Sequence, residues 1–416
     1  EIVRVCNEHR IPIVPRGAGT NLCAGPCPLE GGIVVVFSNM NKILEIDEEN
    51  LTATVQPGVI TQDLIEAVEA KGLFYPPDPS SMKISTIGGN ISENSGGLRG
   101  LKYGVTRDYV LGLEVVLANG DVIRTGGKLA KDVAGYDFTK LIVGSEGTLG
   151  IVTEAILKLI PKPETKKTML ALFDSLEASG RAVSTIIANK VIPTTLEFLD
   201  QGTLEVVEAF AKIGLPTDVG AVLLIEQDGP REVVERDIEK IVDICKRCEA
   251  ISVQVAKTEE EGLALTTARR VALSALARKK PTTILEDATV PRSKIAEMVR
   301  AINEIAKKYD VEIYTFGHAG DGNLHPTCLT DARDKDEMER VEQAFAEIFA
   351  KAIELGGTIT GEHGVGVMKS PYLTWKLGEE GVEAMRTVKR AFDPNNIMNP
   401  GKMFAKESRK RVVVQR

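Results

Sequence analysis

Short apolar segments alternate with amphipathic segments from about residue 162 onward, and this alternation constrains the fold more than any other feature of the chain. Amphipathic stretches such as 232–250 and 334–355 predict charged helices. The pattern predicts an α+β fold whose antiparallel sheet is ferredoxin-like, with helices on one face. The segments with the length and β-branched content of strands are 168–173, 194–199, 221–227, 251–256, 283–287 and 311–316.

Three tracts of small and polar residues interrupt the earlier part of the chain. The first, Arg16-Gly-Ala-Gly-Thr-Asn21, directly follows an apolar strand, and the others fill 76–104 and 144–150. Small residues after a strand let backbone N–H groups approach an anion closely, and the resulting concavity suits a diphosphate. A glycine turn without a ligand explains the first tract equally well, because its spacing is not the dinucleotide fingerprint. The second tract favours ligand binding, since long irregular stretches in compact domains usually bind something.

Bulk composition excludes several classes of protein. A chain of 416 residues is expected to form two or three domains with separate cores. A net charge of -8 argues against sequence-independent binding to nucleic acid, and no apolar run reaches the roughly 18 residues of a membrane span. Six cysteines lack the density of a disulfide scaffold and indicate a reducing, cytoplasmic compartment.

The cysteine pair at 245 and 248 and the first nine residues both have the pattern of helices. The pair Cys245-Lys-Arg-Cys248 falls inside the amphipathic stretch 232–250, so a surface helix that carries two thiols is favoured over a redox or metal motif. Residues 1–9 have the pattern of the second half of an amphipathic helix without a start signal. The chain is therefore expected to begin inside a domain.

Three of the four histidines fall within two glycine-rich segments, where side chains are expected to be displayed rather than packed. One segment is His318-Ala-Gly-Asp-Gly-Asn-Leu-His325, and the other contains Glu362-His363. Two imidazoles and one carboxylate, from His318, His325 and Glu362, would hold a divalent ion and leave one position open for substrate. His363 would then be free to move protons. The alternative for His318 and His325 is a structural role as hairpin residues bonded to the backbone.

Six phrases follow one another along the chain: Pro15-Arg-Gly-Ala-Gly-Thr20, Thr86-Ile-Gly-Gly-Asn90, Gly144-Ser-Glu-Gly-Thr-Leu-Gly150, Gly317-His-Ala-Gly-Asp-Gly-Asn-Leu-His325, Gly361-Glu-His-Gly364 and Asn399-Pro-Gly-Lys402. In this order they closely resemble the FAD-linked oxidases of the vanillyl-alcohol oxidase superfamily, in the branch of D-lactate dehydrogenases and glycolate oxidase D subunits. The resemblance implies a two-lobed FAD-binding domain of PCMH type at 1–161. It also implies a ferredoxin-like cap domain at 162–375 and a C-terminal helical segment at 376–416 that returns to the flavin.

The same resemblance implies that FAD is held between two α+β lobes, with the first glycine turn on the diphosphate. Relatives with covalent FAD often carry a histidine near the place of Thr20, so non-covalent FAD is expected. The residues expected to bind the cofactor are Pro15, Arg16, Gly17, Ala18, Gly19, Thr20, Asn21, Pro77, Thr86, Gly88, Gly89, Asn94, Ser95, Gly147, Ile151 and Asn399.

The substrate implied by the resemblance is a small D-2-hydroxy acid. Arg269 is expected to bind its carboxylate through two parallel hydrogen bonds, with Arg270 as the alternative, and Asn323 is expected to contact the substrate. Relatives that accept a dicarboxylate place a lysine just upstream of a strand aspartate, where this chain has Leu285 before Asp287. D-lactate is therefore favoured, with glycolate next and 2-hydroxyglutarate as the alternative.

The expected chemistry combines a zinc, iron or manganese ion with FAD. The ion would bind the substrate hydroxyl, His363 would accept its proton, and hydride would pass to flavin N5. No cysteine spacing supports an iron–sulfur cluster, so an outside electron acceptor is expected. An electron-transfer flavoprotein, an iron–sulfur subunit or a quinone would serve, and any membrane contact would pass through such a partner. A metal-dependent hydrolase without flavin and a non-catalytic electron-transfer subunit remain alternatives.

Overall fold

The computed structural model describes residues 1–405, which form two compact units, each of mixed helix and sheet. The first unit contains Glu1–Gly97, Gly104–Lys162 and residues 362–405. The second contains Leu98–Tyr103 and Pro163–Gly361. The predicted α+β class is confirmed in both units.

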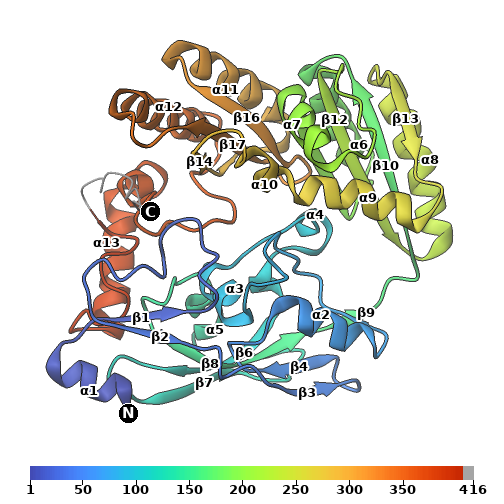
Figure 1. Cartoon of the computed structure of the whole chain (residues 1–416). Coiled ribbons are helices and arrows are strands. Elements are labelled where there is room, and N and C mark those ends of the chain that lie inside the picture. Colours follow the sequence, from blue (N-terminus) through green and yellow to red (C-terminus); the bar gives the residue numbers. More distant parts are fainter. Residues whose placement is uncertain (406–416) are drawn as a thin grey trace. The chain divides into compact units, whose positions relative to one another are not determined.

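The first unit contains a five-stranded antiparallel sheet in the order β3-β4-β8-β6-β7 and a separate parallel pair, β1-β2 (Figure 1). A short antiparallel pair, β5-β9, adds a third small sheet. The strands are β1 Ile13–Arg16, β2 Ile33–Val36, β3 Ile43–Asp47, β4 Thr52–Val55, β5 Leu73–Phe74, β6 Val110–Val116, β7 Val122–Gly126, β8 Ile151–Lys158 and β9 Ile160–Pro161. The α-helices are α1 Ile2–His9, α2 Thr61–Glu69, α3 Ile87–Glu93, α5 Phe138–Ile142 and α13 Leu373–Phe392.

Strand β1 belongs to an apolar core that joins the two ends of the first unit. Ile13 forms a parallel bridge with Met398, and both side chains are fully buried. Val3 and Cys6 of α1 and Ile397 pack into the same core. Burying one such side chain contributes about 1.5–3 kcal/mol relative to leaving it exposed. This packing brings the C-terminal segment to the strand that precedes the first glycine turn.

The second unit is built on one antiparallel sheet in the order β13-β10-β12-β11-β16-β17-β14, with β15 also paired to β17 (Figure 1). The strands are β10 Thr165–Phe173, β11 Thr195–Asp200, β12 Ala221–Gly229, β13 Ser252–Val255, β14 Thr282–Leu285, β15 Ala288–Thr289, β16 Glu312–His318 and β17 Asn323–Thr330. The α-helices are α4 Gly100–Tyr103, α6 Leu176–Ala188, α7 Gln201–Ala211, α8 Arg231–Arg247, α9 Glu259–Arg270, α10 Ala272–Leu276, α11 Ile295–Tyr309 and α12 Lys335–Glu354.

Side-chain caps explain where several of these helices begin. Ser175, Asp200, Thr258 and Asp334 each accept a hydrogen bond from a backbone N–H in the first turn of α6, α7, α9 and α12, respectively. Such caps satisfy N–H groups that have no partner inside the helix, and each is worth about 1 kcal/mol.

Helices cover both faces of this sheet, so the expectation of helices on one face was wrong. Leu224 of β12 packs in a core with Leu204 of α7 and Leu276 of α10. Gln227 points to the opposite face, because side chains alternate along a strand, and its amide donates to Asp237 of α8 at 2.9 Å. Strand β12 is consequently buried along almost its whole length.

The six strands predicted after residue 162 are all present, with ends shifted by a few residues. Strand β17 was not among the predicted strands, and it contains Pro326, which lacks a backbone donor and is unusual in a central strand. Its neighbouring strand is interrupted at that point: β14 ends at Leu285 opposite Thr327, and β15 begins at Ala288 opposite Leu324. The missing donor therefore faces a gap in the ladder.

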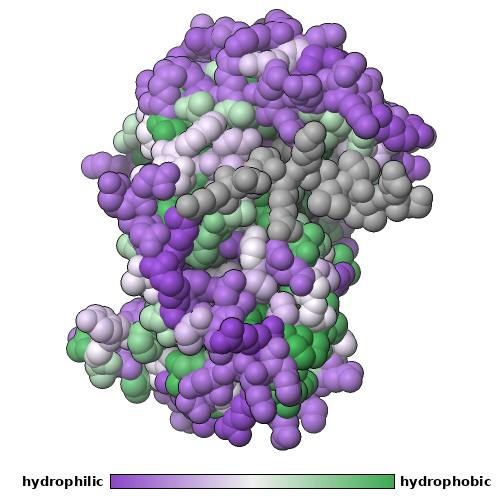
Figure 2. Space-filling model, turned by 90° about the vertical axis from the view of Figure 1, so that its left-hand side faces the viewer, coloured by the Kyte–Doolittle hydropathy of each residue, from purple (hydrophilic) through white to green (hydrophobic). Residues whose placement is uncertain are grey.

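The surface in Figure 2 is mainly hydrophilic, with smaller apolar areas between the charged side chains. Within residues 1–405, no helix has both the length and the apolar character needed to cross a membrane.

Candidate active site

The first glycine turn leaves β1 and passes the N-terminus of α3 within the first unit. Thr86 is the N-cap of α3, and its hydroxyl accepts a hydrogen bond from the Gly89 N–H at 3.3 Å. A Cβ atom on Gly17 would overlap that hydroxyl oxygen, so a larger residue at this position would push the turn away. Two tracts that the sequence predicted to serve one cofactor therefore lie against each other.

Asn21 orders the rest of this turn. Its Oδ1 accepts hydrogen bonds from the N–H groups of Cys23 and Gly25, both at 2.8 Å. Gly19 has a φ of 75°, in the left-handed region that favours glycine. Arg16 and Ala18 are exposed, while Thr20 is partly buried. The turn is thus an ordered run of small residues, whose backbone N–H groups can face an anion.

Asn399 joins the C-terminal segment to this turn. Its backbone N–H donates to the Ile13 carbonyl at 2.7 Å, and its amide Nδ2 donates to the carbonyls of Gly25 at 3.1 Å and Glu146 at 2.7 Å. The side-chain Oδ1 is buried and has no hydrogen-bond partner among residues 1–405. A buried acceptor without a partner is costly, which points to a missing donor at this place.

Gly147 also lies close to the first turn, since a Cβ atom there would come within 2.5 Å of the Pro15 ring. Other predicted cofactor residues have structural contacts in the first unit. The Asn94 side chain accepts from the Arg107 N–H at 2.8 Å, the Ser95 hydroxyl lies 3.4 Å from that of Thr106, and Ile151 packs in the core around β1. Pro77 is buried, and a Cβ atom on Gly88 would lie 2.5 Å from the Pro57 side chain.

These residues fit a dinucleotide cofactor. The glycine turn offers backbone close to a ligand, and Asn399 supplies a buried acceptor beside the turn. Within the first unit, the glycine turn, the start of α3, Gly147 and Asn399 lie together, and their backbone and amide groups suit a diphosphate and a hydrogen-bonding ring system.

The loop that carries His363 rests on two buried carboxyl groups that the sequence analysis missed. Glu146 accepts hydrogen bonds from the Val365 N–H at 2.7 Å and the Gly366 N–H at 2.8 Å. A Cβ atom on Gly364 would lie 2.6 Å from Glu93 Oε2 and 3.0 Å from Glu146 Oε1, so both carboxyl groups face this glycine. Burial, followed by the neighbouring charge of Glu146, raises the pKa of Glu93 well above its usual value.

Asp287 holds the start of this loop from the second unit. Its Oδ2 accepts from the Thr360 hydroxyl and from the Gly361 N–H, both at 2.8 Å, and the carboxylate is fully buried. Gly361 is the last residue of the second unit and directly precedes Glu362 in the sequence.

The candidate metal group is built on the hairpin of β16 and β17. His318 ends β16 and His325 lies on β17, with ring centroids 5.1 Å apart and ring planes nearly perpendicular. The ligand atoms of His318, His325 and Glu362 all lie within 4.8 Å of one another. Two imidazoles and a carboxylate form a donor set that suits zinc, iron or manganese. The predicted set is therefore brought together, and its chemistry fits a divalent ion.

The prediction that these two histidines are displayed rather than packed was wrong. They are 4% exposed and lie on strands, not on an open turn. Strands β16 and β17 do form a hairpin, but the His318 ring forms a hydrogen bond with a side chain, that of Glu197. His363 follows Glu362 on the loop, and the fourth histidine, His9, is exposed at the end of α1.

Glu197 of β11 is the functional candidate that the sequence analysis missed in the second unit. Its Oε1 lies 2.6 Å from His318 Nδ1, and its Oε2 lies 2.6 Å from Arg269 Nη2. Burial alone would raise the pKa of Glu197, but the charges of Arg269 and His318 outweigh it and the pKa is lowered. A charged residue between Leu196 and Phe198 in an apolar strand was the available signal.

The two predicted substrate-binding residues are both buried in the second unit. Arg269 is paired with Glu197, and its guanidinium carbon lies 4.7 Å from the centre of the Phe316 ring. Arg269 Nε and Asn323 Oδ1 have no hydrogen-bond partner among the described residues. A Cβ atom on Gly361 would lie 2.7 Å from Asn323 Nδ2, so this amide borders the residue before Glu362.

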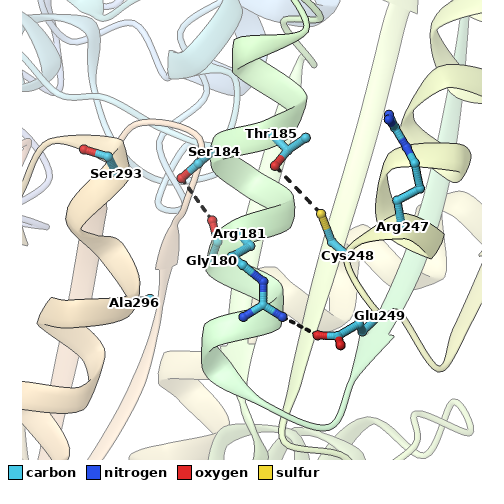
Figure 3. A pocket seen from close by; sticks show the side chains of 9 residues that line it. All are labelled: Gly180, Arg181, Ser184, Thr185, Arg247, Cys248, Glu249, Ser293 and Ala296. Carbon is cyan, nitrogen blue, oxygen red and sulfur yellow. Dashed lines mark hydrogen bonds and ion pairs between the residues drawn. The ribbon is translucent and has the colours of Figure 1, made fainter.

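A pocket elsewhere in the second unit lies beside α6, the end of α8 and the start of α11 (Figure 3). Cys248 points toward the Thr185 hydroxyl at 3.8 Å, and Arg181 pairs with Glu249. Cys245 is fully buried, and burial followed by the neighbouring Cys248 raises its pKa to about 12. The predicted helix is present, with Cys245 in its last turn and Cys248 as its C-cap residue, but both thiols are buried rather than on the surface.

Comparisons with known proteins agree with this geometry. Residues 162–403 match the family of FAD linked oxidases, C-terminal domain, and residues 1–126 match the FAD binding domain family. The glycolate oxidase subunit GlcD of Bacillus subtilis is 77% identical over 415 residues, which cover 100% of this chain and 88% of the relative. A D-lactate dehydrogenase of Anaerostipes hadrus is 39% identical over 415 residues, which cover 97% of this chain and 87% of that protein.

A solved structure of p-cresol methylhydroxylase with substrate bound has a TM-score of 0.79 at 20% identity, covering 97% of this chain and 86% of that one. This likeness concerns the fold and confirms the predicted PCMH-type architecture. Together with the two family matches, it shows that the chain belongs to the FAD-linked oxidases of the vanillyl-alcohol oxidase superfamily.

Proposed function

We propose that this chain is the flavin-binding catalytic subunit of an enzyme that oxidises a small 2-hydroxy acid to the 2-oxo acid. The observation that carries the proposal is the convergence of His318, His325 and Glu362, directly before His363, in a chain of the FAD-linked oxidase family. This family context disfavours a metal-dependent hydrolase. The metal group and His363 disfavour a purely electron-carrying subunit.

The substrate class follows from the polar groups near the metal group. Arg269 offers a fixed positive charge, and the Asn323 amide oxygen has no hydrogen-bond partner within residues 1–405, so a carboxylate and a hydroxyl can both be matched. The identity of 77% to a glycolate oxidase subunit supports glycolate, and the D-lactate dehydrogenase supports D-lactate. We place glycolate ahead of D-lactate, which reverses the order expected from the sequence.

In the proposed mechanism, His318, His325 and Glu362 would hold one divalent ion, whose chemistry there would be to polarise the substrate hydroxyl. Arg269 and Asn323 orient the acid, so that its C2 hydrogen points in one direction. A ring nitrogen of His363 accepts the hydroxyl proton as the C2 hydrogen leaves with its electron pair. FAD, which the glycine turn and Asn399 would help to hold, would supply the hydride acceptor at N5 when bound.

The reduced flavin must then pass two electrons to an acceptor. The relatives named as subunits support a protein partner, in line with the electron-transfer flavoprotein or iron–sulfur subunit expected from the sequence. A peripheral place at a membrane would come through that partner.

Anaerobic titration of the purified flavoprotein with glycolate, D-lactate, L-lactate and D-2-hydroxyglutarate tests the proposal. Loss of the flavin absorbance with glycolate or D-lactate is expected, and little change with the other two acids. A colourless protein that hydrolyses esters or amides would instead indicate a hydrolase. A yellow protein that none of the four acids bleaches would indicate an electron carrier.

A further inference from the structure

We infer that Glu197 is a positioning residue that serves the metal group and Arg269 at the same time. The inference rests on the proposed metal site and deepens it by adding a residue that contacts neither substrate nor ion. Its evidence lies entirely within the second unit.

The sheet register places Glu197 beside His318. Phe198 of β11 pairs with Gly317 of β16 in antiparallel register, so the preceding and following residues, Glu197 and His318, stand opposite each other. Cross-strand neighbours on one face have side chains within direct reach. The 2.6 Å contact between Glu197 Oε1 and His318 Nδ1 is therefore fixed by the backbone of two central strands.

This contact decides which nitrogen of His318 can bind an ion. A carboxylate that accepts from Nδ1–H leaves Nε2 unprotonated and directed away from Glu197. The same hydrogen bond fixes the ring orientation and raises the basicity of the ligating nitrogen. Glu197 thus fixes the tautomer and the ring orientation of His318 in the metal-free protein.

The second oxygen of the carboxylate holds Arg269. Glu197 Oε2 lies 2.6 Å from Arg269 Nη2, and the Phe316 ring packs against the guanidinium. Both charged side chains are buried, at 0% exposure for Glu197 and 4% for Arg269. Nη2 forms an ion pair with Glu197, while Nε has no hydrogen-bond partner among residues 1–405 and is available to donate to an incoming carboxylate. One carboxylate therefore aligns a metal ligand and the predicted substrate arginine.

The alternative is that Glu197 only stabilises the fold as one half of a buried ion pair. Removing one partner of such a pair is strongly destabilising, because the other charge stays buried. A test must therefore separate stability from metal binding, and Glu226 offers a matched control. It is a buried glutamate on the neighbouring strand β12, where it accepts from the Thr168 hydroxyl at 3.1 Å.

The experiment measures the affinity of the chelator-treated flavoprotein for Zn²⁺ and for Mn²⁺, by competition with a chromophoric chelator. Glu197→Gln should bind both ions about 10- to 100-fold more weakly than wild type, the usual effect of losing an outer-shell partner. Glu226→Gln should stay within about twofold, since it contacts neither histidine. With the ion at saturation, Glu197→Gln should also raise KM for glycolate more than it lowers kcat, because Arg269 loses its anchor.

A double variant, Glu197→Gln with Arg269→Met, keeps the test decisive if the single variant folds poorly. Removing both charges should restore the melting temperature, while the weak metal affinity should persist. Recovery of metal affinity together with stability would overturn the inference, and so would a single variant that binds both ions as tightly as wild type. If wild type itself binds neither ion, the proposed metal site fails and this inference falls with it.

Discussion

Replacing Gly364 by alanine tests whether the two buried carboxyl groups support the loop that carries His363. Gly364 has a φ of 82°, and its missing Cβ would lie 2.6 Å from Glu93 Oε2 and 3.0 Å from Glu146 Oε1. The left-handed backbone alone costs alanine about 1–2 kcal/mol. Displacing Glu146 would also weaken its hydrogen bonds to Val365 and Gly366, worth about 1 kcal/mol each. The total destabilisation is about 3–4 kcal/mol.

Gly31 provides the matched control, because its φ is 72° and, apart from Gly31 itself and its two chain neighbours, no atom of residues 1–405 lies within 4 Å of the position of its Cβ. Gly31→Ala should therefore lower the free energy of unfolding only by the cost of the left-handed backbone, about 1–2 kcal/mol. Thermal unfolding followed by flavin fluorescence compares the two variants, and stopped-flow reduction by glycolate reports on His363. We expect Gly364→Ala to unfold at a lower temperature than Gly31→Ala and to reduce its flavin about 100-fold more slowly than wild type. Equal melting temperatures for the two variants would refute the proposed support.

Other changes test separate parts of the account. His363→Ala should keep FAD bound but slow flavin reduction by about 10²- to 10⁴-fold, so a normal reduction rate would remove His363 from the mechanism. Treatment with a chelator should abolish flavin reduction, and Zn²⁺ or Mn²⁺ should restore it; full reduction after chelation would exclude a catalytic ion. Arg269→Lys should raise KM for glycolate about tenfold or more. If only Arg270→Lys raised KM, Arg270 would be the residue that binds the substrate carboxylate. Because the pKa of Glu93 is higher in the folded protein than its unfolded value near 4.5, the protonated carboxyl stabilises the fold at pH values below 4.5. This contribution to the free energy of unfolding is lost as the pH rises through the pKa of Glu93 in the folded protein. The melting temperature should therefore fall as the pH rises, and it should fall less in Glu93→Gln. An unchanged dependence of the melting temperature on pH in this variant would show that Glu93 does not cause it.

Local sequence patterns were sufficient for most elements of the second unit. The 2-residue and 3.6-residue periodicities identified six strands and the long helices α8 and α12 within a few residues. Strand β17 was not predicted, and it contains Pro326, whose missing donor is tolerated because it faces the gap between β14 and β15. The presence of helices on both faces of the sheet was also not predicted, because short strands that are buried on both sides have no alternating pattern of apolar and polar residues.

The candidate site was predictable where its residues are close in sequence. The glycine turn and the run from His318 to His325 are local motifs whose chemistry can be inferred without a structure. Glu197 was not predictable in this way, because its role depends on the register of β11 with β16. The pairing of Glu93 with Glu146 likewise depends on how distant segments pack, and no spacing along the chain indicates it.

The most direct measurement is X-ray diffraction at the zinc absorption edge, from crystals of the flavoprotein grown with Zn²⁺ and glycolate under anaerobic conditions. The account predicts one anomalous peak about 2.0–2.2 Å from a nitrogen of His318, a nitrogen of His325 and a carboxylate oxygen of Glu362, with a glycolate oxygen in the remaining position. An anomalous peak away from these three residues, or none at all, would contradict the account.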